Sequence, residues 1–504
     1  MNADKSLTEK TLEIQEQSTM RKIRKKELKF INNLIENDYK QLLLNENSKI
    51  NNLLPSPEQD AKDEKEDNIL VEDTKNDVKN KFLNKKRIKS KENEEKQGHD
   101  YTFKNCYICK KRLFLDDIHN FYGNLCKKCG DFNYSFRIMK IDMTGRIAIV
   151  TGGRVKIGYY ISTKLLSYGC KVLITSRFPK DALLKYQQDP EYEKWKNNLL
   201  IYPIDFRLFK SVVKFINYLN DNFTHIDILI NNAAQTLRKT TSYYKNLLPI
   251  EMKQLKQEDE NKIIKVDYVS QNPYQLDEEL KLKNNKNEIK TALTYKQNEY
   301  NEFLPLSVIA SQIKIMEEKN QPIINVLGND GQPYDFSDGK NSWNLEFDEI
   351  PFQEFTEVQM INAWVPYYLC VKLKPLILKS PFPDKYIVNV TAVEGIFNHF
   401  KKTTHVHTNM AKASLNMFTR TCGKYLKKDG IYMTCVDTGW VSPMNEINKI
   451  MNVDTKDNFE QEFTNIPLDE LDGAMRVLHP IIEGIKNKNY LYGILLKDYK
   501  KSDW

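Results

Sequence analysis

The feature that most restricts the fold of this chain is an apolar run that ends in a glycine-rich turn. Residues 146–158 read Arg-Ile-Ala-Ile-Val-Thr-Gly-Gly-Arg-Val-Lys-Ile-Gly, an amphipathic segment follows, and further apolar runs occupy residues 171–176 and 227–230. Glycines permit close backbone approach, and a helix N-terminus presents N–H groups and the positive end of its dipole. The order of these elements predicts an α/β fold, a doubly wound parallel sheet of the Rossmann type with a pyrophosphate-binding turn.

Composition divides the chain into three parts. Residues 1–100 are rich in Lys, Glu, Asn and Asp, which predicts a charged, largely disordered extension with one helical segment between Leu28 and Leu44. Residues 101–140 contain clustered cysteines, and residues 141–504 are predicted to be the Rossmann-type domain. Inside that domain, residues 251–300 are again rich in Lys, Asn, Glu and Gln, which predicts a low-complexity insertion looping out of the fold.

The net charge of +8 is modest for a chain of this length, and basic runs occur at residues 21–26 and 85–91. We interpret these runs as solvated charges on a flexible extension; the alternatives are a nucleic-acid contact or a nuclear signal. No base-reading motif is present, so no nucleic-acid partner is expected. The sequence contains no run of about eighteen apolar residues and no apolar signal-peptide core near residue 1, so we expect a cytoplasmic protein without a membrane partner.

Four of the eight cysteines form two closely spaced pairs, and the other four lie apart in apolar segments. Four thiolates in two C-x2-C pairs match a tetrahedral, structural zinc site without an open position, and the alternatives are free thiols or two disulfides. His119, between the pairs, is a substitute ligand that four cysteines make unnecessary. We expect the module to pack against the neighbouring α/β domain, because the linker between them is short. The predicted metal ligands are Cys106, Cys109, Cys126 and Cys129.

The glycine turn and the segments after it resemble the short-chain dehydrogenase/reductase family. The resemblance rests on the turn at residues 151–158, on Ile204-Asp205, on Asn231-Asn232-Ala233-Ala234 and on Asn362, and it covers about residues 142–504 apart from the insertion. It implies a bound dinucleotide, a small-molecule substrate and a homo-oligomer. The residues predicted to bind the cofactor are Thr151, Gly152, Gly153, Arg154, Lys156, Ile157, Gly158, Ser176, Arg177, Asp205, Asn231, Ala233 and Lys412.

Three cations in this set favour NADP(H) over NAD(H). Lys156 stands where the family's middle glycine would be, and Arg177 follows the second strand in place of the acidic residue that binds a ribose 2′-hydroxyl. With Arg154 they would surround the adenosine ribose, and their charge would complement a 2′-phosphate. The alternative is that all three are ordinary surface cations.

The family's catalytic tetrad is only half present. Lys412 matches the family's lysine and Asn362 its helix asparagine, but Thr408 stands in the position of the tyrosine that exchanges the proton. Ala392 stands in the position of the serine, with Thr391 beside it. Lysine and tyrosine are four residues apart in this family because residues i and i+4 share one face of a helix.

An aliphatic hydroxyl is a far weaker acid than a phenol, so Thr408 cannot simply replace tyrosine. We hypothesise that His407 or His405 supplies the proton, oriented by Glu394; the alternative is that no acid is present. The arrangement resembles an atypical subset of the family that lacks the usual Ser and Tyr and carries a cysteine module in front.

Two functions are compatible with these residues. The first is an NADP(H)-dependent oxidoreductase that transfers hydride to or from a carbonyl, hydroxyl or imine group, with Asn362, Lys412, His407 and Thr408 as the predicted catalytic residues. The second is a catalytically inactive scaffold or sensor that binds NADP(H) and uses its zinc module for protein contacts.

Overall fold

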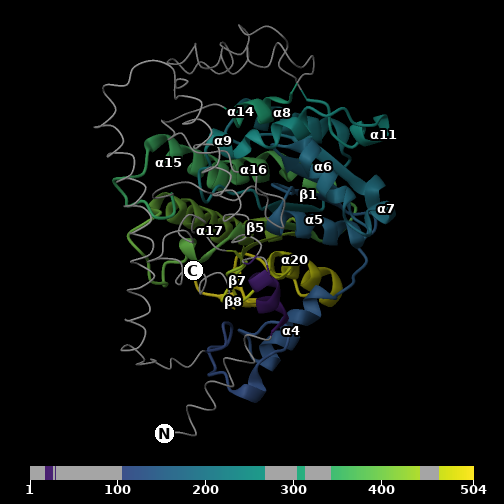
Figure 1. Ribbon diagram of the computed structural model, residues 1–504. Helices are drawn as coiled ribbons and strands as arrows, with labels where there is room; N and C mark the ends of the chain where they lie inside the picture. Colours follow the sequence, from purple (N-terminus) through teal and green to yellow (C-terminus); the bar gives the residue numbers. More distant parts are fainter. Residues whose placement is uncertain (1–17, 27–28, 30–104, 267–303, 313–341, 443–464) are drawn as a thin grey trace, which may run out of the picture.

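A single eight-stranded sheet organises the computed structural model, which describes residues 18–26, 29, 105–266, 304–312, 342–442 and 465–504 (Figure 1). The strand order is β3-β2-β1-β4-β5-β6-β7-β8, with neighbours from β3 to β7 parallel and β8 antiparallel to β7. The predicted Rossmann-type α/β fold is therefore confirmed. The strands are β1 (Ile147–Val150), β2 (Lys171–Ser176), β3 (Leu199–Pro203), β4 (Ile228–Asn231), β5 (Lys385–Thr391), β6 (Ile431–Asp437), β7 (Leu495–Lys497) and β8 (Lys500–Ser502).

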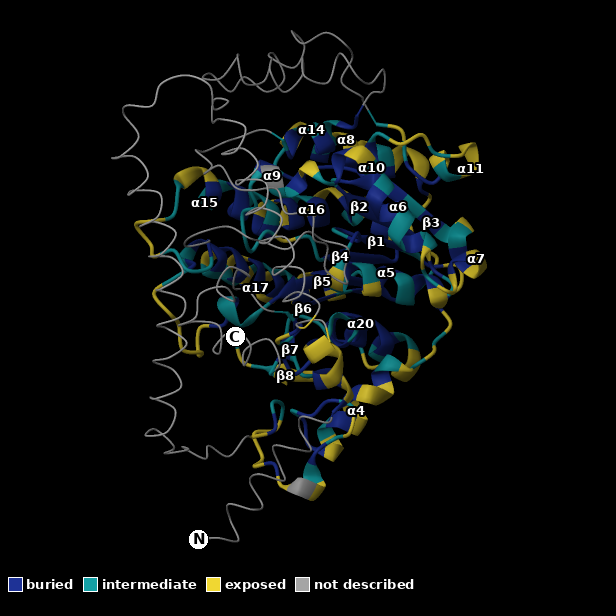
Figure 2. Ribbon diagram, in the orientation of Figure 1, coloured by how far each residue is buried: buried dark blue, intermediate teal, exposed yellow. Residues whose placement is uncertain are grey.

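Alternating side chains of the central strands fill two cores, one on each face of the sheet. Val150 belongs to the core beneath α5, α6 and α20, whereas its neighbour Ile149 belongs to the core beneath α8 and α16. Both faces are covered, so the strands are buried throughout their central parts (Figure 2). The long helices are α5 (Lys156–Ser167), α6 (Pro179–Gln187), α8 (Phe209–Asn222), α16 (Val365–Leu378), α17 (Val406–Lys427) and α20 (Glu470–Asn487).

Shorter helical segments complete the α/β domain around the edges of the sheet. They are α7 (Tyr192–Trp195), α9 (Thr241–Lys245), α10 (Leu248–Glu251), α11 (Gln257–Glu260), α14 (Leu306–Ala310), α15 (Phe352–Gln359), the 3-10 segments η2 (Lys196–Asn198) and η4 (Val393–Gly395), and the π-helix η3 (Met360–Trp364). No helix in the described ranges is long and apolar enough to cross a bilayer.

The cysteine module packs against the C-terminal part of the domain, as expected. It contains η1 (Leu115–Asp117) and α4 (Lys127–Arg137), and α4 lies beside α20 (Figure 1). At the contact, Asp472 of α20 accepts hydrogen bonds from Tyr122 (2.8 Å) and Asn133 (2.9 Å). It also forms an ion pair with Arg137 (2.9 Å). The Phe136 ring stacks on Tyr499, with ring centroids 4.2 Å apart. The module is thus part of the main body of the protein.

The basic run at residues 21–26 differs from the expectation of solvated charges at its two arginines, whereas Lys22, Lys25 and Lys26 are exposed. Residues 19–26 are helical, Met20 is buried in the module's core, and Arg21 and Arg24 are also buried. Arg24 donates to the carbonyl of Leu468 at 2.7 Å. These arginines therefore anchor the segment to the domain. The second basic run and most of the predicted helix between Leu28 and Leu44 lie outside the described residues.

The predicted insertion begins later than residue 251. Glu251 is fully buried and its carboxylate accepts from the backbone N–H groups of Lys180 and Asp181 at the start of α6. Ile263 pairs with Ile201 at the edge of the sheet. Residues 251–266 therefore belong to the domain. Although this segment is rich in charged residues, Glu251 caps the start of α6 and Ile263 pairs with the edge strand β3. Residues 267–300 lie outside the described residues.

Candidate functional site

Hydrogen bonds connect the glycine turn after β1 to the loop after β4. The Thr151 hydroxyl accepts from the N–H groups of Asn232 and Ala233, both at 3.0 Å, and the Asn232 side chain donates to the carbonyls of Thr151 and Gly152. A Cβ on Gly158 would lie 2.1 Å from the Gly152 oxygen, so only glycine fits there. Thr151, Gly152, Gly158 and Ala233 thus build one rigid turn, as their predicted shared site requires.

Helix α5 begins directly at this turn without a side-chain cap. Its N-cap residue Val155 makes no side-chain hydrogen bond to the helix, so the first N–H groups of the helix are not satisfied from there. Lys156 is exposed with φ of 53°, and Ile157 packs against the module's core. An uncapped helix start next to a tight glycine turn has the donors that a pyrophosphate needs, so these residues fit a dinucleotide.

Two of the three cations predicted to surround a 2′-phosphate lie against one ring: the guanidinium carbons of Arg154 and Arg177 are 5.4 and 5.7 Å from the centre of the Phe178 ring. Arg154 is buried and pairs with Asp181 of α6 at 2.6 Å. Lys156 is the first residue of α5 and lies near α20. Burial raises the pKa of Glu470 in α20, and the nearby charge of Lys156 lowers it. Only Arg177 of the three lines the pocket described below. The grouping of these three residues around a 2′-phosphate stays a prediction.

Three other predicted cofactor residues, Asp205, Asn231 and Ser176, already have hydrogen-bond partners inside the protein. Burial raises the pKa of Asp205, but its fork-like pairing with Arg207, as close as 2.7 Å, outweighs burial and holds the pKa below its usual range. Asn231 donates to Asn389 of β5 at 2.8 Å, across the register of β4 and β5. Ser176 exchanges hydrogen bonds with the backbone of Phe178 and shapes the turn after β2. Gly153 packs under Ile174, where a Cβ would lie 2.6 Å from that side chain.

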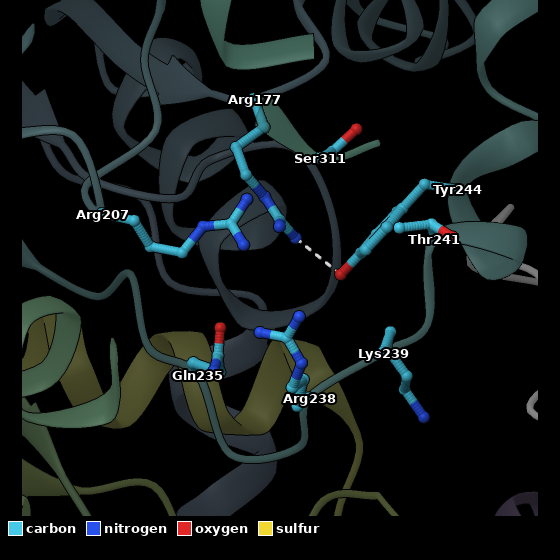
Figure 3. A pocket seen from close by; sticks show the side chains of 8 residues that line it. All are labelled: Arg177, Arg207, Gln235, Arg238, Lys239, Thr241, Tyr244 and Ser311. Atoms are coloured by element: carbon cyan, nitrogen blue, oxygen red, sulfur yellow. Dashed lines mark hydrogen bonds between the residues drawn. The ribbon is translucent and has the colours of Figure 1, made fainter. Parts of the chain in front are cut away.

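A small polar pocket lies at the ends of β2, β3 and β4 (Figure 3). Arg177, Arg207, Arg238 and Lys239 surround it, and Arg177 donates to the Tyr244 hydroxyl at 2.8 Å. The sequence reasoning included Arg177 and missed the other three. Their positions after β3 and after β4 were the available signal, because parallel strands bring their carboxyl ends to one edge of the sheet.

Asn362 lies in the π-helical turn η3 between α15 and α16 and is 1% exposed. Its side-chain oxygen accepts from the Gln235 N–H at 2.7 Å, and its amide donates to the Gln235 carbonyl at 2.9 Å. A π-turn inside an α-helix is frequent at functional sites. The asparagine thus ties this turn to the loop after β4.

Lys412 and Thr408 share one face of α17, one helical turn apart. Burial lowers the pKa of Lys412 to about 8, partly opposed by the charge of Glu394. Its ammonium donates to the carbonyl of Val390 at the end of β5, at 2.8 Å. Within the described residues, the buried hydroxyls of Thr408 and Thr391 have no hydrogen-bond partner. Buried hydroxyl groups usually have a hydrogen-bond partner, and a substrate oxygen could accept a hydrogen bond from these two.

The histidines hypothesised to be the acid are placed unfavourably for that role. His407 is fully buried, burial lowers its pKa to about 4, and its Nε2 faces Glu354 of α15 at 3.8 Å. His405 precedes the first residue of α17 without making a side-chain cap hydrogen bond, and its ring stacks on Trp343, with ring centroids 4.0 Å apart. A histidine that is neutral at pH 7 and enclosed between helices is a poor proton donor. Sequence reasoning missed Glu354, which faces His407, and chose Glu394 instead.

The four cysteines of the module converge on one point. Their sulfur atoms all lie within 4.8 Å of one another, and Cys109 and Cys126 are 3.7 Å apart. A zinc–sulfur bond of about 2.3 Å in tetrahedral geometry places sulfurs about 3.8 Å apart, so the donor set fits that ion. His119 is not one of the clustered ligands: its Nδ1 accepts from the Phe121 N–H at 3.1 Å, and its Nε2 lies 3.3 Å from the Asp131 carboxylate.

Comparison with known proteins finds similarity to one family over part of the chain. The family model described as short chain dehydrogenase matches residues 146–270. The uncharacterized protein R665 of Acanthamoeba polyphaga mimivirus is 28% identical over 411 residues, which cover 79% of this chain and 74% of that protein. The (+)-neomenthol dehydrogenase of Capsicum annuum is 33% identical over 90 residues, and the polyprenol dehydrogenase of Danio rerio is 29% identical over 133 residues.

The two named dehydrogenases are matched over only 29% and 39% of their own lengths, so the chain spans about a third of each. Among solved structures, the Pseudomonas aeruginosa RhlG/NADP active-site complex is 14% identical with a TM-score of 0.39, over 70% of this chain and 95% of that one. Carveol dehydrogenase from Mycobacterium avium in complex with NAD is 12% identical with a TM-score of 0.42, over 71% and 97%. The chain is therefore similar to short-chain dehydrogenases over residues 146–270, and the parallel sheet of the Rossmann type is what the structure itself shows.

Proposed function

We propose that this protein is an NADP(H)-dependent oxidoreductase that acts on a carbonyl, hydroxyl or imine group of a small molecule. Three features together carry the proposal. Helix α5 begins at the glycine turn without a side-chain cap. Lys412 donates to the Val390 carbonyl at the end of β5, and Asn362 bonds to Gln235 in the loop after β4. Those strand ends meet at one edge of the sheet, where open α/β sheets bind their ligands.

A bound nicotinamide would supply or accept the hydride, and the chain would do the rest. In reduction, the substrate oxygen gains an electron pair and needs one proton. Lys412, whose pKa burial lowers to about 8, can give up a proton near neutral pH, and the Thr408 hydroxyl on the same helix face can donate a hydrogen bond to that oxygen. Asn362 holds the loop after β4 in position through Gln235. Lys412 thus replaces the histidines as the proposed proton source.

We also propose that the four cysteines hold a structural zinc ion. The metal would leave no open position and would take no part in hydride transfer, because the protein supplies all four ligands. The ion would fix the module's turns, from which Tyr122, Asn133 and Arg137 reach the domain.

A catalytically inactive NADP(H)-binding scaffold remains the second candidate. The observation favouring it is that Arg154, Asp205 and His407 are enclosed with internal partners, and that Thr408 and not a tyrosine stands four residues before Lys412 in α17. The contact between the module and the domain counts against the module as a free docking unit, since its polar side chains already serve that contact.

A titration of the purified, zinc-loaded protein with NADPH and with NADH tests the proposal. We expect NADPH to bind more tightly, and NADPH oxidation with a carbonyl substrate found by screening to fall at least about a hundred-fold in Lys412→Met. Binding of NADPH without turnover of any substrate class would favour the scaffold. Failure of both nucleotides to bind folded protein would reject both functions.

A further inference from the structure

One tyrosine of the cysteine module contacts the α/β domain at the carboxyl end of β6. Tyr107 lies between Cys106 and Cys109 in the sequence, and its hydroxyl oxygen accepts a hydrogen bond from the backbone N–H of Trp440 at 3.0 Å. We propose that Tyr107 is a positioning residue, which holds the loop after β6 (residues 438–442) in the conformation that binds a dinucleotide. This role rests on the proposed function, because it requires that a dinucleotide binds.

The loop after β6 begins beside the proposed substrate site. Asp437, the last residue of β6, pairs in register with Thr391 of β5, whose buried hydroxyl has no hydrogen-bond partner within the described residues. The Lys412 ammonium donates to the carbonyl of the preceding residue, Val390, at 2.8 Å. Trp440 follows Asp437 by three residues. A shift of this loop would therefore act where the substrate and the reacting part of the cofactor would lie.

Contacts from outside the α/β domain hold the loop after β6. Its own strand supplies one contact, because the Asp437 carboxylate accepts from the Gly439 N–H at 2.9 Å. The module supplies another through Tyr107, and the helical segment at residues 19–26 supplies a third, because Arg24 donates to the Val441 carbonyl at 3.3 Å. The conformation of the loop thus depends on parts of the chain that precede the α/β domain.

The Tyr107 hydroxyl lies close against the loop backbone. Gly439 has φ of 79°, and a Cβ at this position would lie 2.8 Å from the Leu468 side chain and 3.3 Å from the Tyr107 hydroxyl oxygen. A side chain larger than that of glycine would therefore push the loop away from the module. The close approach makes the hydrogen bond to Trp440 a direct constraint on the loop.

The same module also contacts the start of helix α5. Ile157, the second residue of α5, and Val441 of the loop both pack in the module's apolar core, which contains Cys106 and Cys126. A Cβ on Gly473 of α20 would lie 3.1 Å from Ile157 and 3.3 Å from Val441, so these two side chains meet at one position of α20. The module therefore supports both the glycine turn and the loop after β6.

The strand order predicts which half of a dinucleotide depends on Tyr107. A sheet with the order β3-β2-β1-β4-β5-β6 has two halves, each of which binds one mononucleotide at its carboxyl edge. The glycine turn and β1 to β3 form the half that binds adenosine, and the loop after β6 belongs to the other half. Loss of the Tyr107 contact should therefore weaken binding of the whole dinucleotide and spare binding of its adenosine part. A general loss of stability would not separate the two.

The test is calorimetric binding of NADPH and of adenosine 2′,5′-bisphosphate to the full-length, zinc-loaded protein. Tyr107→Phe removes only the hydroxyl that accepts from Trp440, and Arg24→Gln weakens the hold on Val441 from outside the cysteine turns. Tyr122→Phe is the matched control, because it removes a hydroxyl of the same module that donates to Asp472 of α20 instead. Circular dichroism and metal analysis check the folding and zinc content of each variant. If Tyr107→Phe loses its zinc, Arg24→Gln decides.

We expect the affinity for NADPH to fall about five-fold in Tyr107→Phe and in Arg24→Gln, as for one lost hydrogen bond, with the affinity for the bisphosphate unchanged. Tyr122→Phe should bind both ligands as the unchanged protein does. The role of Tyr107 is overturned if its variant binds NADPH normally, if both ligands weaken equally, or if Tyr122→Phe weakens NADPH binding as much. These three results leave the proposed function intact. If the unchanged protein binds neither NADPH nor NADH, the proposed function is rejected, and the role of Tyr107 with it.

Discussion

The sequence predicts a metal site in the cysteine module and a proton donor in the first turn of α17. The structure brings the predicted residues together in the first case and not in the second. The four module ligands meet within 4.8 Å, whereas His407 is turned away from solvent toward Glu354. The module's ligands come in pairs two residues apart, so local turns orient each pair. The proposed acid depended on which helix covers which face of α17, and that is a long-range property.

Exchange of one cysteine ligand should produce the largest effect of any change considered. Cys126 is buried at the start of α4, and Cys126→Ser replaces a strong zinc ligand with a weak one. We expect bound zinc to fall from about one per chain to near zero, with a loss of stability of at least about 3 kcal/mol. Metal analysis and thermal unfolding measure both effects. The scattered Cys422→Ser is the matched control, and full zinc content in Cys126→Ser would contradict the metal site.

Breaking the docking of the module should cost less than removing its metal. Arg137→Met leaves the buried carboxylate of Asp472 without its cation, and loss of one partner of a buried pair costs about 3 kcal/mol or more. Zinc content should stay at about one per chain. Denaturant unfolding with parallel metal analysis measures this, and loss of zinc together with stability would mean that the metal site and the docking cannot be separated.

Removal of His407 should change how stability depends on pH. Its pKa is about 4 in the folded protein and near 6.5 when unfolded, so between these values the unfolded chain binds the extra proton. The free energy of unfolding is therefore not reduced by this histidine above pH 6.5, and it declines as the pH falls from 6.5 toward 4. In His407→Gln this decline should be smaller by about 2–3 kcal/mol. Unfolding at pH 7.5, 5.5 and 4.5 measures it.

The same variant sharpens the contrast between the two regions. If His407 is the proton donor, turnover of an identified substrate should fall sharply in His407→Gln at pH 7. If it is a packed core residue, turnover should change little while the pH dependence of stability flattens. Identical pH profiles for the two proteins would contradict the burial of this side chain.

The smallest expected effect is the loss of one hydrogen bond across the docking surface. Tyr122→Phe removes the hydroxyl that donates to Asp472 at 2.8 Å, while Asn133 and Arg137 still contact the same oxygen. A decrease of about 1 kcal/mol in unfolding free energy is expected, with zinc content unchanged. Phe121→Leu, in the same turn, serves as a packing control. A decrease as large as that of Arg137→Met would show that the hydroxyl organises the whole contact.

The sequence by itself determined the features that depend on short range. Apolar runs and a glycine turn in the order of residues 146–158 specified the strand, turn and helix, since period and turn chemistry act on neighbouring residues. The paired cysteines specified a cluster for the same reason.

Only the tertiary structure decided which charged groups meet. Arg154 pairs with Asp181, Arg207 pairs with Glu357, and Arg24 donates to the Leu468 carbonyl from the far N-terminal part of the chain. The sequence could not specify these pairs, because a buried charge takes whichever partner the packed helices and loops bring within reach. The cationic pocket arises in this way, from residues after three different strands that become neighbours only when the sheet forms.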